Sequence, residues 1–196
     1  MVTQITKLMV FNQALQHLGV TGKLSDVNED NDNGAALRTA FPIVLKSALE
    51  AHAWDFATTH ATLSLVSDAD NLTEFQYLFE KPPNCLRIWS VFTTNPTEPI
   101  SYKSTKDGIY TNAETTNVEY TEDISDFNAF PGEFAEYLSY KLAEMAEPEI
   151  LNSDSTNSRL AQKVSITQAK SASQSVVEYP NKYKFESNWL QNRTFF

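Results

Sequence analysis

Apolar side chains recur at three- and four-residue spacing in two segments near the start of the chain. The first, from Ile5 to Leu18, predicts a short amphipathic helix, and Gly19 can end it because glycine accepts a left-handed backbone. The second, residues 34–57, carries an apolar stripe made of Leu37, Phe41, Val44, Leu45, Ala48 and Leu49. Pro42 interrupts this stripe, so we expect the second helix either to begin close to Pro42 or to kink there. Trp54 and Phe56 should anchor the turn that follows.

The loop between these two helices superficially resembles a calcium loop, because Asp26, Asn28 and Asp30 alternate. The sixth position, which should be glycine, is Asn31, and the twelfth, which should be a bidentate glutamate, is Leu37. A solvated loop that caps the next helix through Asp32 or Asn33 explains the same residues better.

The period changes from helical to alternating between Ala61 and Thr121, which predicts short strands. We expect these strands to form one small antiparallel sheet over residues 61–66, 75–79, 86–92, 100–103, 109–111 and 118–121. Asp107-Gly108 supplies a tight turn between two of them, because hairpin turns need a residue that accepts positive φ.

Helical spacing returns at Pro131, with Phe134, Leu138, Leu142 and Met145 on one face. Pro148 should stop or bend this helix. A further helix, capped by Asp154 or Ser155, has a narrow stripe of mostly small residues that suits close helix contact: Leu160, Ala161, Val164, Ala169, Ala172 and Val176. Pro180 should end regular structure.

These elements predict an α+β fold, an α-helical bundle of about four helices from both ends of the chain with an inserted small antiparallel β domain and an extended C-terminal tail. The predicted divisions are residues 1–57 (helical, first part), 58–128 (β), 129–178 (helical, second part) and 179–196 (an extended C-terminal tail).

The charge of the chain restricts its partners. With 196 residues and a formal charge of -10, the chain is long enough for a substantial core and too acidic for an extended nucleic-acid footprint. Cys85 is the only cysteine, so neither an internal disulfide nor a cysteine-based metal cage is available. The N-terminus does not have the apolar run of a signal peptide, and no stretch approaches the length of a membrane span.

The sequence offers little for catalysis. It has no Gly-x-Ser-x-Gly elbow, no glycine-rich phosphate loop and no dinucleotide fingerprint, and it contains five glycines. His17, His52 and His60 lack the spacing of a zinc site, and His17, near a helix C-terminus, should favour its charged form. We therefore expect no metal and no cofactor.

Two charged segments remain. Between Glu114 and Glu149 the chain has ten carboxylates and one cation, Lys141. The last segment, from Tyr179 to Phe196, is mildly basic and rich in aromatic side chains, which makes exposure of the whole segment to water unfavourable.

Four blocks of sequence resemble the tail tubular protein A family, the adaptor or head-tail joining proteins of short-tailed bacteriophages. They are Phe41-Pro42 with Leu45, Leu49, His52, Trp54, Phe56 and Ala57; Tyr77-Leu78 with Pro83-Asn84-Cys85-Leu86-Arg87-Ile88; Gly108-Ile109-Tyr110-Thr111; and Phe130-Pro131-Gly132-Glu133-Phe134 with Leu138, Leu142 and Ala143. The order and spacing of the blocks carry the resemblance, which extends to about Val177. Asn84 departs from the family, which often has Asp there, and 79–81 lengthen the approach to the prolines.

The resemblance implies a structural virion protein without enzymatic activity. Such adaptors form a ring, usually of twelve copies, between the portal protein and the tail nozzle protein, and DNA passes through the ring without specific binding. We expect acidic residues to line that channel and repel DNA, with Glu133, Glu136, Glu144 and Glu147 as candidates. We expect the tail to bind the portal through Tyr179, Tyr183, Phe185, Trp189, Arg193, Phe195 and Phe196.

Two alternatives stay open at this point. A tail-associated glycan hydrolase would use two carboxylates, such as Glu133 and Glu136, although both also suit the positive end of a helix dipole. The other alternative is an oligomeric binding module unrelated to phages.

Overall fold

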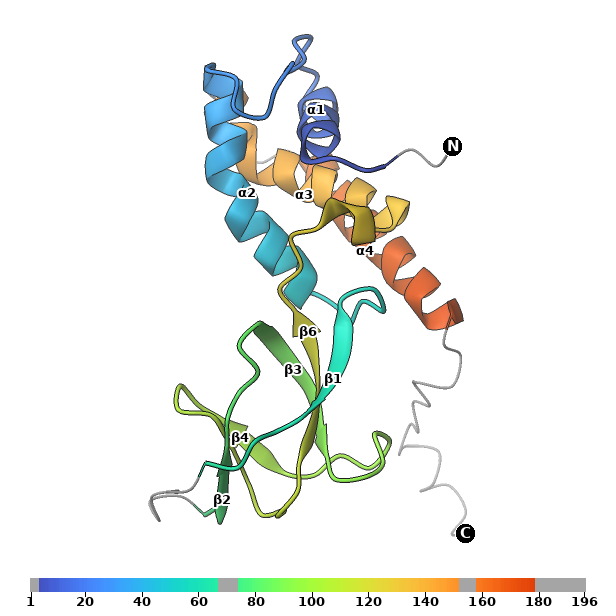
Figure 1. The fold of residues 1–196 in the computed structure, drawn as a ribbon. Helices are drawn as coiled ribbons and strands as arrows, with labels where there is room; N and C mark the ends of the chain where they lie inside the picture. Colours follow the sequence, from blue (N-terminus) through green and yellow to red (C-terminus); the bar gives the residue numbers. More distant parts are fainter. Residues whose placement is uncertain (1–3, 67–73, 152–157, 179–196) are drawn as a thin grey trace, which may run out of the picture.

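The computed structural model describes residues 4–66, 74–151 and 158–178, and the account below concerns these residues. The fold is mixed α+β, with four α-helices, a short 3-10 helix and two small antiparallel sheets within the described residues. In Figure 1 the helices fill the upper part of the molecule and the strands the lower part. The elements in chain order are α1 (Lys7–His17), α2 (Asp32–Glu50), β1 (Thr58–Thr62), β2 (Tyr77–Phe79), β3 (Cys85–Phe92), β4 (Tyr102–Ser104), β5 (Ile109–Thr111), β6 (Asn117–Glu122), η1 (Phe127–Ala129), α3 (Gly132–Leu151) and α4 (Ser158–Glu178).

The first helix ends as its sequence predicts. Gly19 has a φ of 78°, in the left-handed region, and follows the last turn of α1 directly. At the other end the Thr6 side chain accepts a hydrogen bond from the Met9 amide and caps α1. The buried face of the helix is formed by Val10, Phe11, Ala14 and Leu15.

The second helix has a different N-cap from the predicted one, and of the two alternatives at its proline the structure excludes a start close to Pro42. Helix α2 begins at Asp32 and continues through Pro42, so it does not begin close to the proline. The predicted caps Asp32 and Asn33 are also wrong, because the Asn31 side chain accepts the hydrogen bond from the Gly34 amide at 2.7 Å. Pro42 cannot donate a backbone hydrogen bond within the helix. The burial of Phe41 and Val44, which lie near it in α2, compensates for that lost hydrogen bond.

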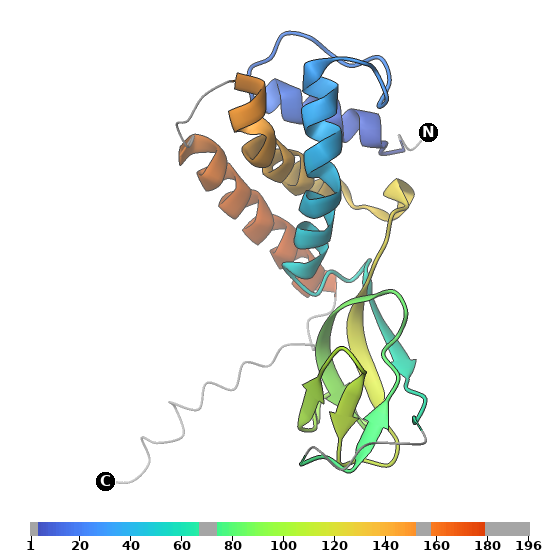
Figure 2. The same ribbon diagram turned by 90° about the vertical axis from the view of Figure 1, so that its left-hand side faces the viewer.

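Helix α3 is the helix that the other three contact, and its closest neighbour is α4. Figure 2 shows α3 and α4 running side by side, with α2 crossing in front of them. Pro148 does not stop α3, which continues to Leu151. The face predicted for α3 is buried at Phe134, Leu138 and Leu142, but Met145 is 51% exposed, so that assignment was wrong.

The small-residue stripe predicted for α4 is partly wrong. Ala169 is exposed, and the buried positions of α4 are Leu160, Thr167 and Ser171, with Val164 and Ala172 partly buried against the helical core. The predicted caps Asp154 and Ser155 lie outside the described residues, and so does the side chain of Val176.

The predicted single sheet is instead two three-stranded antiparallel sheets, with strand orders β1-β6-β3 and β2-β5-β4. The first strand also starts earlier than predicted, at Thr58, where it pairs with Thr121 of β6. Single bridges tie the sheet edges together, Leu65 to Phe79 at one side and Phe92 to Pro99 at the other. This closure leaves less unpaired backbone at the edges of both sheets.

The Asp107-Gly108 turn lies between β4 and β5, as predicted. Gly108 has a φ of 147° and its carbonyl oxygen accepts a hydrogen bond from the Thr105 amide at 2.9 Å. Glycine is needed there for a second reason, since a Cβ at this position would collide with the carbonyl oxygen of Phe79.

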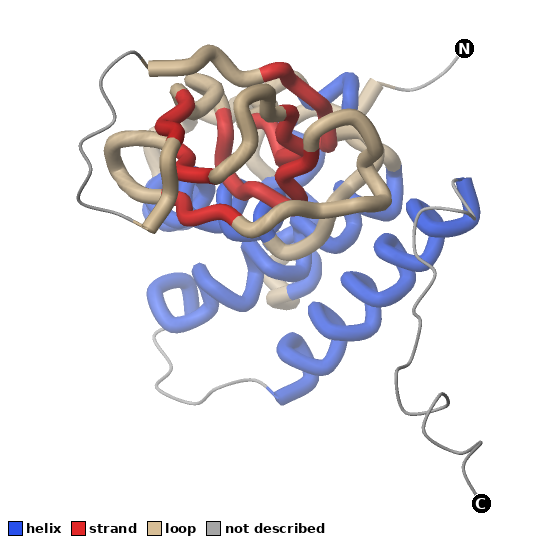
Figure 3. The backbone as a smooth tube through the Cα atoms, turned by 90° about the horizontal axis from the view of Figure 1, so that it is seen from below, coloured by secondary structure: helices blue, strands red, loops and turns tan. Residues whose placement is uncertain are grey.

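Two separate hydrophobic cores support these two parts of the molecule. The larger core lies among the helices, and the smaller core lies between the sheets around Phe79, Val91, Ile109 and Val118. Seen from below in Figure 3, the strands form a layer in front of the helices. The connections between the two parts are the segment from α2 to β1 and the segment from β6 to α3.

Candidate interaction surfaces

An aromatic cluster fills the junction between the helices and the strands. Trp54 is 1% exposed, and its indole N–H donates a hydrogen bond to the Ala48 carbonyl oxygen at the end of α2. The Phe56 ring lies 4.8 Å from that of Phe134 and 5.7 Å from that of Phe130, measured between centroids. Trp54 and Phe56 thus anchor the turn out of α2, as their positions in the sequence predict.

Strand β3 adds a second set of contacts at the same junction. Arg87 donates a hydrogen bond to the carbonyl oxygen of Glu50 at 2.7 Å, and its guanidinium lies 4.2 Å from the centre of the Trp89 ring. The Asn84 carbonyl oxygen accepts a hydrogen bond from the Asp123 amide. Residues far apart in the sequence therefore meet at this one place.

The four acidic side chains proposed for a channel lining lie on α3, and none of them is fully exposed. Glu133, Glu136 and Glu144 are half-buried, whereas Glu147 is 6% exposed. Glu136 forms an ion pair with Lys170 of α4 at 3.6 Å. The other three helices contact α3, so part of its surface is covered. Glu147 is therefore placed to add little charge to the surface of a single chain.

Carboxylates elsewhere in the acidic segment are more accessible. Glu114, Asp123, Asp126 and Glu149 are exposed, and Glu114 accepts a hydrogen bond from the Tyr77 hydroxyl at 3.3 Å. The negative charge of Glu114 is the main reason that the pKa of Tyr77 is raised. The number of acidic residues in the sequence identified this segment as acidic, but it did not indicate which of its carboxylates are exposed.

The residues proposed to bind a portal lie outside the described residues. They are Tyr179, Tyr183, Phe185, Trp189, Arg193, Phe195 and Phe196.

An apolar groove lies between α2 and α3, which the sequence pattern did not reveal. Its volume is about 290 Å³, and Ile43 and Met145 on its walls are 62% and 51% exposed. Lys141 crosses it, donating hydrogen bonds to the Ser47 hydroxyl at 2.9 Å and the Tyr137 hydroxyl at 3.3 Å. Burial raises the pKa of Tyr137 to about 12, so this hydroxyl stays protonated near neutral pH. In the sequence, the hint of this groove was Ile43, an apolar residue that lies outside the apolar stripe of α2.

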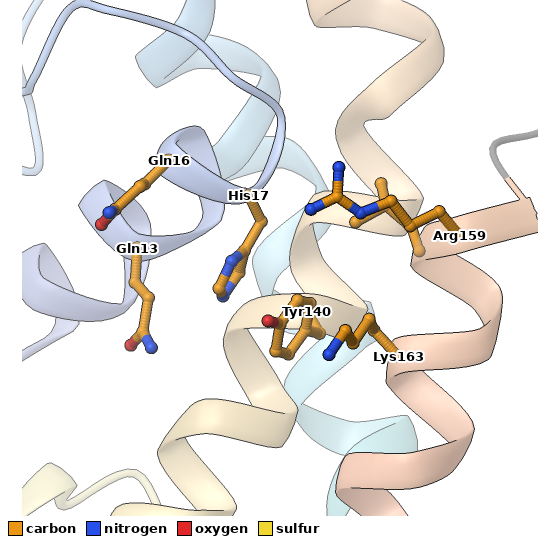
Figure 4. A pocket seen from close by; sticks show the side chains of 7 residues that line it. Gln13, Gln16, His17, Tyr140, Arg159 and Lys163 are labelled. Carbon is orange, nitrogen blue, oxygen red and sulfur yellow. The ribbon is translucent and has the colours of Figure 1, made fainter.

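A second cavity, of about 360 Å³, opens between α1, α3 and α4. Figure 4 shows Gln13, Gln16 and His17 of α1 on one side, Tyr140 of α3 below, and Arg159 and Lys163 of α4 on the other side. The rings of His17 and Tyr140 are stacked, with 3.6 Å between centroids and 10° between planes.

The expectation that His17 favours its charged form was wrong. Burial lowers its pKa, the negative charge of Glu136 opposes that change, and the positive charge of Lys163 adds to it. His17 does lie in the last turn of α1, where the dipole favours a cation, but desolvation of the ring has the larger effect.

The structure provides no observation that favours the hydrolase. Four cavities formed by described residues are lined by at most one carboxylate each, Glu80 in one and Glu144 in another. Glu133 lies in the first turn of α3, where a carboxylate complements the helix dipole. A pair of carboxylates in a cleft, which glycan hydrolysis needs, is not present in these four cavities.

The loop that resembles a calcium loop is held by its own hydrogen bonds. Glu29 accepts hydrogen bonds from the Ser25 amide and hydroxyl and from the Asn31 side chain, while the Asp26 carboxylate accepts one from the Asn28 amide. Throughout the described part of the chain, no three His, Cys, Asp or Glu side chains are grouped as metal ligands.

Cys85 is a half-buried free thiol whose pKa is raised by burial.

Within the described residues, none of the helices combines the length and the apolar character needed to cross a lipid bilayer. No protein-family model matches this chain, and no curated protein matches it either.

Proposed function

We propose that this chain is a head-to-tail adaptor of a short-tailed bacteriophage, a structural virion protein of the tail tubular protein A type. About twelve copies form a ring between the portal protein and the tail nozzle protein, and the ring gives DNA a passage during ejection. The chain acts as a structural element and not as an enzyme, and it resides in the neck of the virion after synthesis in the host cytoplasm.

The observation that carries this proposal is the meeting of the family-like blocks at the junction between helices and strands. The block that ends in Trp54-Asp55-Phe56-Ala57 contacts the block that begins with Phe130 and includes Phe134. The block with Arg87 bonds to the end of α2. Three of the four blocks thus meet at this junction, whereas Gly108-Ile109-Tyr110-Thr111 lies at β5 in the other sheet. The meeting of the three supports treating them as a joint signature.

In this proposal the helices form a bundle, the strands form an inserted β domain, and residues 179–196 form an extended tail. A ring assembled head to tail needs two different complementary faces on each subunit. The helices supply these faces, and the apolar groove with exposed Ile43 and Met145 is one candidate surface. The β domain faces the nozzle by elimination.

The charge of the chain suits a channel through which DNA slides. The formal charge is -10, so the ring repels the phosphate backbone and nonspecific binding stays weak. Of the candidate lining residues, Glu133 and Glu144 are accessible enough to contribute, whereas Glu136 is paired with Lys170, and exposed Asp123 and Glu149 add to them.

The experiment that tests the proposal compares the full chain with a chain that lacks residues 179–196, each mixed with the candidate portal ring and sedimented. The full chain should sediment with the portal, whereas the shortened chain should stay in the supernatant because it has lost its aromatic anchors. Equal thermal unfolding of both chains would show that the deletion spares the fold. Sedimentation of the shortened chain at the level of the full chain would refute the role of the tail.

The hydrolase alternative has a separate assay. Incubation of the full chain with peptidoglycan or capsular polysaccharide should release no reducing sugar, and release above the level of a heat-inactivated sample would support the alternative.

A further inference from the structure

The outer face of α4 carries an exposed apolar side chain beside two cations. Ile166 is 58% exposed, and the exposed residues Lys163 and Lys170 lie three positions before it and four positions after it. That spacing places all three side chains on one face of the helix. The buried residues Leu160 and Ser171 lie on a different side of α4. The face that α4 turns to solvent is therefore apolar at its centre and positively charged next to it.

The groove between α2 and α3 offers a matching surface. Its volume is about 290 Å³, and the exposed apolar residues Ile43, Met145 and Pro148 line it. The half-buried residue Glu144 belongs to the same lining. The groove is therefore an apolar hollow with a carboxylate on its α3 wall.

Lys141 also lines this groove, but its ammonium is engaged by hydroxyl groups. It donates hydrogen bonds to Ser47 and Tyr137. Within the described residues it forms no ion pair with Glu144, although the charge of Glu144 opposes the effect of burial on the pKa of Lys141. The Glu144 carboxylate can therefore accept a hydrogen bond from a cation of another molecule.

The two helices that carry these surfaces have opposite charges. Helix α3 contains five carboxylates and one cation, whereas α4 contains three cations and one carboxylate, Glu178. Within one copy an ion pair joins them where Lys170 meets Glu136 at 3.6 Å. Lys163 forms no ion pair with any described residue. Opposite charges on Lys163 and Glu144 therefore remain for a contact between copies.

We propose that the outer face of α4 docks into the α2–α3 groove of a second copy of this chain. Ile166 of one copy enters the groove beside Ile43 and Met145 of the next, and Lys163 pairs with Glu144 across the contact. The proposal rests on the ring of the proposed function and names the contact that builds it. Because the two surfaces differ, the contact repeats head to tail and can close into a ring, which a symmetric contact cannot do.

Exposed apolar area points to the same pairing. Among the described residues, Ile43, Ile166 and Met145 are three of the four most exposed large apolar side chains. Each surface by itself leaves this area in water, which is unfavourable. A single kind of contact covers all three side chains in every copy of a closed ring.

Disulfide cross-linking tests this contact directly. Ile166→Cys and Met145→Cys are made in separate chains, in which Cys85→Ser removes the native thiol. On oxidation a mixture of the two variants should give a cross-linked dimer, because a disulfide forms only where two Cα atoms come within about 7 Å. Each variant alone should give no dimer, since like surfaces do not meet in a head-to-tail contact. A chain with both substitutions should give a ladder of multimers.

A matched control places the cysteine on another exposed apolar residue. Leu65 is 53% exposed and lies outside α4, so Leu65→Cys mixed with Met145→Cys should give no dimer. Absence of the dimer between Ile166→Cys and Met145→Cys, with the portal both present and absent, would overturn the proposal. Dimers that form equally well within one variant would overturn it too, because they indicate a symmetric contact. Cross-linking of Met145→Cys to the portal instead would assign the groove to that partner.

Substitutions without cysteine measure the contribution of each group. Sedimentation gives the concentration at which copies assemble, and Ile166→Gln should raise it about tenfold because the exposed part of the side chain is buried on assembly. Lys163→Glu should also raise it, and adding Glu144→Lys to the same chain should restore it. Lys103→Glu makes the same charge change at an exposed residue of β4 and should have no effect. Assembly of Ile166→Gln at the parental concentration would contradict the proposal.

The cross-linked samples also separate this proposal from the adaptor function. About a dozen copies bound to the portal without the cross-link would refute this contact and leave the adaptor function standing. A ladder of cross-linked multimers in a sample that leaves the portal unbound would support the contact and refute the adaptor function.

Discussion

Two histidines of this chain lie in environments that disfavour their charged forms. His17 of α1 is stacked on Tyr140 of α3, and the ring of His52 lies 5.0 Å from that of Trp54, between centroids, just after the end of α2. Burial lowers the pKa of both, although Glu136 and Asp55 oppose the effect at His17 and His52 respectively. At the residue scale, therefore, desolvation outweighs local charge.

These lowered pKa values predict the direction in which stability changes with pH. Both histidines bind a proton less readily in the folded chain than in the unfolded chain, where the ordinary pKa is 6.5. Their contribution is complete above that value, so the free energy of unfolding should begin to fall as the pH drops below about 6.5 and should go on falling until the pH has passed the lower pKa of the folded chain.

Urea unfolding of a His17→Gln and His52→Gln double variant measures this contribution. The double variant should show a shallower dependence of the unfolding free energy on pH than the parent chain. His60→Gln changes an exposed ring and should keep the parental slope. A double variant with the full parental slope would show that other groups cause the pH dependence.

At the scale of elements, the long amphipathic helices were the most predictable part of the fold. The buried stripe of α2 lies where three- and four-residue spacing places it, and the positive φ of Gly19 ends α1 as glycine at that position suggests. Capping was less predictable because it depends on distant contacts. The Arg38 guanidinium donates to the carbonyl oxygens of Val27 and Glu29, which shapes the loop so that Asn31 is the cap.

The sheets were less predictable for a related physical reason. Alternation along the chain identifies a strand, but it does not say which strands pair, because pairing joins residues that are far apart in the sequence. Strand β1 pairs with β6, and the bridge from Leu65 to Phe79 leads into the other sheet. The prolines did not mark helix ends, since α2 continues through Pro42 and α3 continues through Pro148.

The turn between β4 and β5 gives a prediction at this scale. Gly108→Ala should lower the free energy of unfolding by about 2 kcal/mol or more, because the backbone is at positive φ and the added Cβ meets the Phe79 carbonyl oxygen. Gly132→Ala is the matched control, since nothing lies within 4 Å of a Cβ there, and its effect should stay below about 1 kcal/mol.

Chemical denaturation of the two alanine variants makes the comparison. Equal stability of Gly108→Ala and Gly132→Ala would mean that the hairpin adjusts without cost and that Gly108 is not required by the turn.

At the scale of the whole molecule, the sequence located the candidate surfaces only in part. It identified α3 as an acidic element, but Glu147 is buried and Glu136 is paired with Lys170, which depends on how α3 packs against α4. Its one hint of the groove was Ile43, which lies off the apolar stripe of α2, and it gave no sign of the cavity between α1, α3 and α4, because each is assembled from separate helices. The role of the aromatic residues of 179–196 in portal binding remains a prediction from the sequence.

The adaptor proposal requires that copies of this chain assemble on a portal ring. Mass photometry of the full chain, alone and mixed with the candidate portal, measures this assembly. The mixture should contain a complex whose mass exceeds that of the portal by about a dozen copies of the chain. A portal whose mass is unchanged in both low and moderate salt would contradict the adaptor function.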